Sequence, residues 1–208
     1  MTTEGPIQIS TSADDAEEKD SGASFSSTRG LITFSASNTS DALRYNGGFR
    51  FNAVDIANGD TIDDVDMEVF MVYNGDRINC DIRANDVDDA VDFSSDADVT
   101  TRVDSAATSA KASWFKTGTP SGFRKSSTDD FVDATLVVQE VIDRGSWASG
   151  NDLVILLQGH DDSSWFYCEC RSYDGVSSQA ARLTIDFTAA GGGPAVLSSR
   201  RLLSGTGR

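Results

Sequence analysis

The sequence predicts an all-β protein: an antiparallel jelly-roll β-sandwich with one short helix and extended N- and C-terminal arms. Two observations lead to this fold class. Apolar and polar side chains alternate over short segments, and clusters of Asp, Asn, Gly and Ser separate those segments. Seven to nine strands can be counted in this way, which is typical of a two-sheet sandwich. The 208 residues suffice for one such domain.

The clearest strand covers residues 65–73. Its odd positions, from Val65 to Tyr73, are all apolar, and its early even positions are acidic, which predicts one buried and one wet face. The following Asn74-Gly75-Asp76 predicts a hairpin turn, with a second strand from Ile78 to Ala84. Further strands are expected at Leu31–Ser35, around Phe49 and Phe51, and at Ser109–Phe115, Leu153–Gln158, Trp165–Arg171 and Leu183–Thr188.

One segment departs from the alternation. Between Phe131 and Arg144 the apolar residues change to helical spacing, and Gly145 follows as a stop signal; the residues concerned are Val137, Val138, Val141 and Ile142. The pattern predicts a strand that runs into the single short helix.

The two ends differ from the body at residues 31–188. Residues 1–30 contain a short strand-like piece at 6–10 and then a polar, acidic stretch, which predicts a mobile arm. Residues 189–208 open with Ala-Ala-Gly-Gly-Gly-Pro, a linker signal. From residue 187 onward there are three arginines and no acid, so this basic tail is predicted to dock on an acidic partner through Leu197, Arg200, Arg201, Leu202 and Leu203.

The net charge is −16 at pH 7, with 33 acidic against 17 basic residues. Nucleic-acid binding through a basic face is therefore not expected, because phosphate contacts need cationic surface. No apolar run approaches the ~20 residues of a membrane-spanning helix, so a soluble protein without a membrane partner is expected. The Asp-rich, Lys-poor composition favours a saline environment, where acidic surfaces keep chains soluble.

Motifs of catalysis are not found, and the chain is predicted not to be an enzyme. The single histidine, His160, lies in an Asp/Ser loop with no nucleophile-elbow motif near any serine, which favours a solvated side chain. The acidic residues allow many carboxylate pairs, but their spacing selects none for a glycosidase. The three cysteines, Cys80, Cys168 and Cys170, are predicted to be buried free thiols, and no cofactor is expected.

Two binding features remain open. The acidic stretch with Asp86, Asp88 and Asp89 is either a structural calcium site or a solvated turn, and it lacks the glycine and final glutamate of an EF-hand loop. Trp147, Trp165 and Phe166 lie near loop signals. They either stack on sugar rings or pack in the core.

Several stretches carry a resemblance to a known group of proteins. They include Gly48-Phe49-Arg50-Phe51, residues 61–69, residues 85–90, the strand at Trp114, residues 138–153 and residues 183–187. These stretches resemble small β-sandwich proteins of tailed-virus particles, whose sandwich is similar to carbohydrate-binding modules and DNRLRE-type domains.

The resemblance implies a virion structural protein, either a capsid decoration or turret component or a part of the tail or fibre. Its partners would be other virion proteins and further copies of itself, in a homo-oligomer. The alternative is a glycan-binding module that recognises the host surface.

Overall fold

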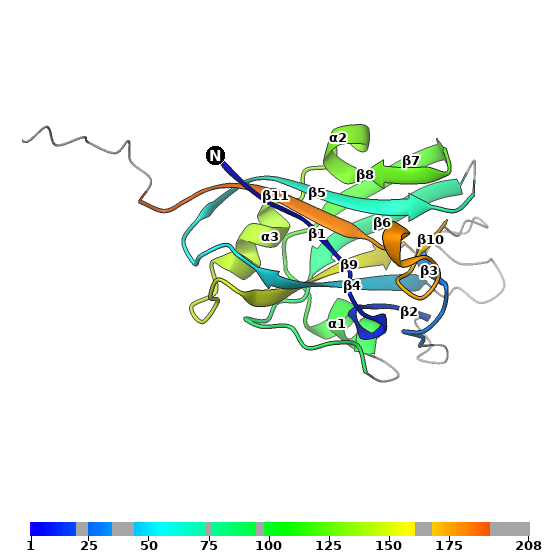
Figure 1. Cartoon of the computed structure of the whole chain (residues 1–208), viewed down its shortest axis with the longest axis horizontal. Helices are drawn as coiled ribbons and strands as arrows, with labels where there is room; N and C mark the ends of the chain where they lie inside the picture. The colour runs from blue at the N-terminus through cyan, green and yellow to red at the C-terminus, as the bar shows by residue number, and fades with distance from the viewer. Residues whose placement is uncertain (20–24, 35–43, 74–75, 95–97, 161–167, 192–208) are drawn as a thin grey trace, which may run out of the picture.

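The computed structural model describes residues 1–19, 25–34, 44–73, 76–94, 98–160 and 168–191. Two antiparallel sheets pack face to face, which confirms the predicted all-β sandwich (Figure 1). The first sheet has the order β1 (Thr2–Gln8), β11 (Arg182–Thr188), β5 (Thr61–Met71), β10 (Cys168–Arg171) and β3 (Leu31–Phe34), and β8 (Gly122–Lys125) also pairs with β5. The second sheet has the order β2 (Asp15–Lys19), β4 (Tyr45–Val54), β9 (Asn151–Gly159), β6 (Asp76–Ala84) and β7 (Ala112–Thr119). The finer jelly-roll order of the strands stays a prediction.

The alternation in β5 is confirmed, but the predicted hairpin after it is wrong. Val65, Met67, Val69 and Met71 are all buried between the sheets. However, β5 and β6 belong to different sheets: β11, β8 and β10 pair with β5, whereas β9 and β7 pair with β6. A turn signal shows that the chain changes direction; it does not determine which strand the next one joins.

The predicted arm at residues 1–30 is also wrong for the part that the structure describes. Strand β1 pairs with the closing strand β11, and β2 pairs with β4 at the edge of the second sheet. Three of the acids that suggested an arm, Asp15, Glu17 and Glu18, are buried in β2, where each accepts a hydrogen bond. Glu17, for example, accepts hydrogen bonds from the Arg29 guanidinium and the Thr33 N–H. Composition predicted a wet segment because acids are seldom buried unless they are paired.

Three short helices are present among the described residues, where one was predicted. They are α1 (Asp98–Ser105), α2 (Ser126–Asp130) and α3 (Thr135–Ile142), with single 3-10 turns at Ser12–Asp14 and Ser177–Gln179. The predicted apolar face of α3 is confirmed, since Val137, Val138, Val141 and Ile142 are buried. The strand expected before α3 does not form. The three cysteines are free and buried, as predicted.

Apolar side chains form two cores. The larger one fills the space between the sheets. The smaller one lies on the outer face of the second sheet, where Phe93, Val99 and Val103 from the 85–105 segment cover Val154 and Leu156 of β9. Phe93 occupies the centre of this cover, with the Arg102 guanidinium 4.5 Å from its ring centroid.

Gly48 of β4 is the position at which Phe93 meets the sheet. A Cβ at residue 48 would lie 2.4 Å from Cζ of Phe93, far inside van der Waals contact. The ring therefore packs directly against the backbone of β4, and only glycine leaves room for it.

We expect Gly48→Ala to lower the free energy of unfolding by about 1–3 kcal/mol, as overpacking of a core does. Urea denaturation measures this change. Gly145→Ala is the matched control, because nothing lies within 4 Å of a Cβ at that position. Equal stability of the two variants would contradict the packing of Phe93 on Gly48.

Asp15 of β2 has an unusual environment. It is buried, its Oδ2 accepts the Tyr173 N–H at 2.8 Å, and its Oδ1 has no hydrogen-bond partner. Burial raises the pKa of Asp15 to about 7, and the negative charges of Asp174 and Asp14 add to this effect. The folded chain therefore holds this proton more tightly than the unfolded chain does.

This difference predicts a pH dependence of stability. The contribution of Asp15 to the free energy of unfolding should fall as the pH rises from about 4 to about 7, because over this range the folded state still holds a proton that the unfolded state has released. Asp15→Asn should remove this fall and stabilise the protein at pH 8 by a few kcal/mol, since one pKa unit corresponds to about 1.4 kcal/mol. Urea midpoints measured across this pH range test the prediction. Asp92→Asn, at an exposed position, serves as control. The assignment would be contradicted if the urea midpoint of Asp15→Asn changed with pH in the same way as that of the wild type.

Candidate functional site

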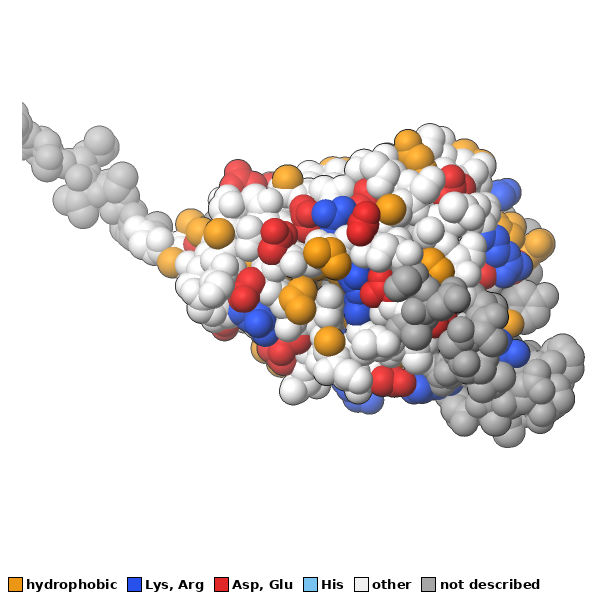
Figure 2. Space-filling view, turned by 90° about the horizontal axis from the view of Figure 1, so that it is seen from below, with side chains coloured by type: hydrophobic (Ala, Val, Ile, Leu, Met, Phe, Trp, Pro, Cys, Tyr) orange, Lys and Arg blue, Asp and Glu red, His pale blue; other side chains and the backbone are white. Residues whose placement is uncertain are grey.

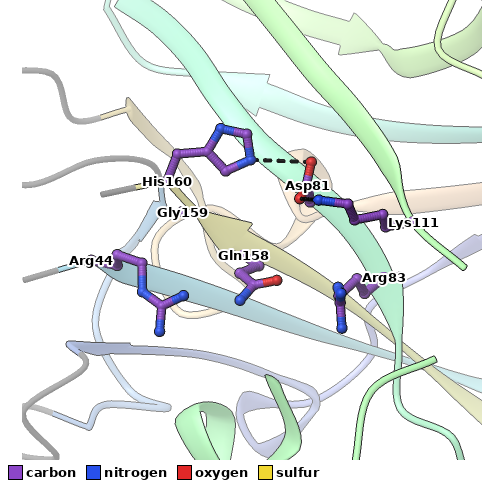
Figure 3. A pocket seen from close by; sticks show the side chains of 7 residues that line it. All are labelled: Arg44, Asp81, Arg83, Lys111, Gln158, Gly159 and His160. Atoms are coloured by element: carbon purple, nitrogen blue, oxygen red, sulfur yellow. Dashed lines mark hydrogen bonds and ion pairs between the residues drawn. The ribbon is translucent and has the colours of Figure 1, made fainter. Parts of the chain in front are cut away.

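A polar hollow of about 560 Å³ opens on the outer face of the second sheet, beyond the end of the smaller core. Figure 3 shows the side chains around it: Arg44, Asp81, Arg83, Lys111, Gln158, Gly159 and His160. Among the described residues, its lining contains no aromatic side chain and four cationic or titratable basic groups. The charge of the hollow is therefore opposite to that of the chain as a whole.

Strand register explains why these residues meet. Gln158 of β9 pairs with Asp81 of β6, and residues opposite each other in a sheet point to the same face. Arg83 lies two positions beyond Asp81 and shares that face. Arg44, Lys111 and His160 lie at the ends of strands: Arg44 and Lys111 immediately precede β4 and β7, and His160 immediately follows β9.

Asp81 organises one side of the hollow. Its carboxylate accepts hydrogen bonds from Lys111 Nζ at 2.7 Å and from Ser113 Oγ at 2.6 Å, and His160 Nε2 lies 3.1 Å away. Burial raises the pKa of Asp81, but the hydrogen bonds from Lys111, Ser113 and His160 outweigh burial, so the pKa is lowered. Asp81 is thus an ionised anchor, and His160, predicted to be solvated, is held beside it with 38 % of its side chain exposed.

This arrangement does not resemble a Ser-His-Asp triad. In a triad the imidazole lies between the hydroxyl and the carboxylate and removes the hydroxyl proton. Here Ser113 and His160 both contact the carboxylate of Asp81, so the imidazole does not activate the hydroxyl. The geometry favours binding.

On the other side of the hollow, two side chains are available to a ligand. Among the described residues, Arg83 donates a single hydrogen bond, to Thr108 O at 3.2 Å, and forms no ion pair. Gln158 lies between Arg44 and Arg83 on the floor (Figure 3). Arg44 is engaged with Asp104 at 3.3 Å. The sequence did not reveal this site, because its residues are scattered over residues 44–160 and none belongs to a motif.

The glycan-binding prediction is wrong for Trp147. Only 4 % of this residue is exposed, and its indole Nε1–H donates to Ile56 O at 2.9 Å. The ring belongs to the larger core and cannot stack on a sugar. Trp165 and Phe166, together with the tail residues Leu197, Arg200, Arg201, Leu202 and Leu203, lie outside the described residues.

For the acidic stretch with Asp86, Asp88 and Asp89, the structure favours a turn held by an ion pair over a calcium site. Asp86 and Asp88 both accept hydrogen bonds from the guanidinium of Arg144, and Asp89 accepts the N–H of Asp152 at 2.9 Å. The positive charge that pairs with Asp86 and Asp88 is an arginine 56 residues from Asp88, which local sequence does not indicate. In the described part of the chain, no group of three or more potential metal-ligating side chains occurs.

We therefore expect the melting temperature of the wild-type protein to be unaffected by millimolar calcium or by a chelator. Arg144→Ala should lower the free energy of unfolding by about 1 kcal/mol, since a partly exposed ion pair contributes little more. Thermal unfolding with and without calcium measures both effects. Stabilisation of the wild type by calcium would contradict the assignment of Arg144 to this loop.

Comparison with known proteins adds no relative: no protein-family model and no curated protein matches the chain. Among the described residues, no helix is long and apolar enough to cross a membrane. The functional argument therefore depends on the chemistry of the surface.

Proposed function

We propose that this chain is a non-enzymatic structural protein of a tailed-virus particle, in the capsid decoration or turret or in the tail or fibre. Other virion proteins and further copies of the chain are its partners in this proposal. The resemblance of the sequence supports this proposal. One feature of the surface supports it too: an exposed aromatic ring at a backbone position that the fold fixes.

That ring is Phe131, at the C-terminal end of α2. It is 90 % exposed, and its backbone adopts φ = 58°, in the left-handed region that costs a non-glycine residue about 1–2 kcal/mol. Its N–H closes α2 by donating to Ser127 O at 3.0 Å. Leu136, five residues further on, is 73 % exposed. Large apolar side chains in water mark interaction surfaces when they lie close together.

Asp130, the residue before Phe131, fixes the backbone that carries this ring. Its carboxylate accepts hydrogen bonds from Trp114 Nε1 at 2.9 Å and from Arg124 Nε at 2.7 Å, and Lys116 Nζ lies 3.1 Å away. Burial raises the pKa of Asp130, but these donors outweigh it and the pKa is lowered. The residue before Phe131 is therefore locked to β7 and β8. An exposed aromatic side chain on a fixed backbone suits a protein partner, because little backbone entropy is lost on docking.

We expect Phe131→Ser to reduce the number of copies per particle by about tenfold, the effect of roughly 1.4 kcal/mol of lost docking energy. The melting temperature should stay close to that of the wild type, since the ring contributes little to the core. Quantitative mass spectrometry of purified particles, relative to the major shell protein, measures the copy number.

Val91→Ser is the matched control, because Val91 is 69 % exposed but lies elsewhere, in the segment that precedes α1. Unchanged incorporation of Phe131→Ser would refute the docking role of the ring. Absence of the wild-type chain from particles would overturn the proposal as a whole.

A second function, recognition of a host-surface glycan, is favoured by the hollow on the second sheet. The hollow is open, polar and within the size range of small-ligand sites, about 300–1,000 Å³. A glycan array probed with the full chain tests this function. Saturable binding supports recognition, and no binding across the array opposes it.

A further inference from the structure

We propose that the hollow binds the carboxylate of an acidic sugar residue, with Arg83 as its main cationic contact and Gln158 beside it. This inference rests on the second function, glycan recognition, and specifies the chemical class of the ligand.

Charge points to an anionic ligand. The chain carries −16, yet the described lining of the hollow brings together Arg44, Arg83 and Lys111 with one carboxylate, Asp81. Most described arginines are paired with acids; those whose ion pairs are given by the structure are Arg29, Arg44, Arg50, Arg102, Arg124, Arg144 and Arg182. Arg83, in contrast, reaches only the carbonyl of Thr108 within the part of the chain that the structure describes. A guanidinium with a free edge is a ready partner for a carboxylate.

The buried part of Arg83 supports the same conclusion. Its Nε is inaccessible to solvent and has no hydrogen-bond partner. The side chain is thus held in place over β6 without an internal acid to balance its charge. An anion in the hollow would balance that charge, which water cannot do fully because Nε of the guanidinium is out of contact with solvent.

The lining favours a hydroxyl-rich ligand with one charge. Gln158 presents an amide with no hydrogen-bond partner among the described residues, and an amide can both donate to and accept from hydroxyl groups. Asp104 pairs with Arg44 and Asp81 pairs with Lys111, so Arg83 is the one permanent cation of the lining that has no acid among the described residues, which matches a single carboxylate better than a polyphosphate. An extended polyanion such as a nucleic acid would also be repelled by the acidic body around the hollow.

Since no aromatic side chain is among the described residues that line the hollow, those residues offer a neutral sugar no ring to stack on. The arrangement in Figure 3 agrees with one sugar ring lying across Gln158: Arg83 stands at one side of it, and the pair of His160 and Asp81 stands along the edge. The opening to solvent allows such a ring to be the terminal residue of a longer glycan.

Isothermal titration of the full chain tests the proposal, with a glucuronate-terminated oligosaccharide as the probe and its glucose-terminated counterpart as the neutral control. We expect the acidic probe to bind at least about tenfold more tightly than the neutral one. Arg83→Gln should weaken binding of the acidic probe about tenfold and leave the neutral probe unaffected. Arg83→Lys should restore binding only in part, because it keeps the charge but not the fork of donors.

Arg182→Gln is the matched control, since Arg182 is an ion-paired arginine on the first sheet, and it should bind like the wild type. Gln158→Ala supplies a second variant in case Arg83→Gln does not fold, and it too should weaken binding. Equal affinity for both probes would overturn the charge argument while leaving glycan recognition in place. Tighter binding of inorganic sulfate, phosphate, a peptide carboxylate or an oligonucleotide would overturn the assignment to a sugar acid, as would no binding at all. None of these outcomes alters the copy number in particles, so the structural proposal stands or fails separately.

Discussion

The fold depends on the burial of β9 from both sides. Its inward side chains Leu153, Ile155 and Leu157 fill the space between the sheets, and its outward side chains Val154 and Leu156 lie under Phe93 and α1. A central strand with apolar residues on both faces can be stable only if each face is covered. The sandwich supplies one cover, and the segment from residue 85 to 105 supplies the other.

The second cover is shorter than the sheet, and this determines where a site can form. It ends at Leu156, and from Gln158 onward the outer face of β9 turns polar. The hollow opens at this boundary. Its position next to a rigid, doubly packed strand means that Gln158 and Asp81 are held by backbone pairing, a better support for a binding site than a loop.

Charge is distributed by pairing. On the face shown in Figure 2, acidic and basic side chains lie next to one another. In the interior, acids such as Asp14 and Asp130 accept several hydrogen bonds each. Burial raises the pKa of Asp14, but its partners, foremost Arg50, outweigh burial and the pKa is lowered. Arg83 in the hollow departs from this internal compensation, because it forms no ion pair among the described residues. Phe131 is a separate exception, since its apolar ring lies in water. Both side chains are therefore available to contact another molecule.

The sequence by itself determined the fold class, the buried face of β5, the apolar run of β9, the helical face of α3 and the burial of the thiols. All of these follow from local periodicity or composition, since a side chain's face is set by its position along its own strand or helix. Only the tertiary structure decided which sheet β6 joins, that the first nineteen residues contribute a strand to each sheet, and that Arg144 pairs with Asp86 and Asp88. These are contacts between residues far apart in the chain, and the free energy that selects them comes from the packing of whole sheets, which no local pattern records. The hollow belongs to the same class, because strand register across β6 and β9 brings its residues together.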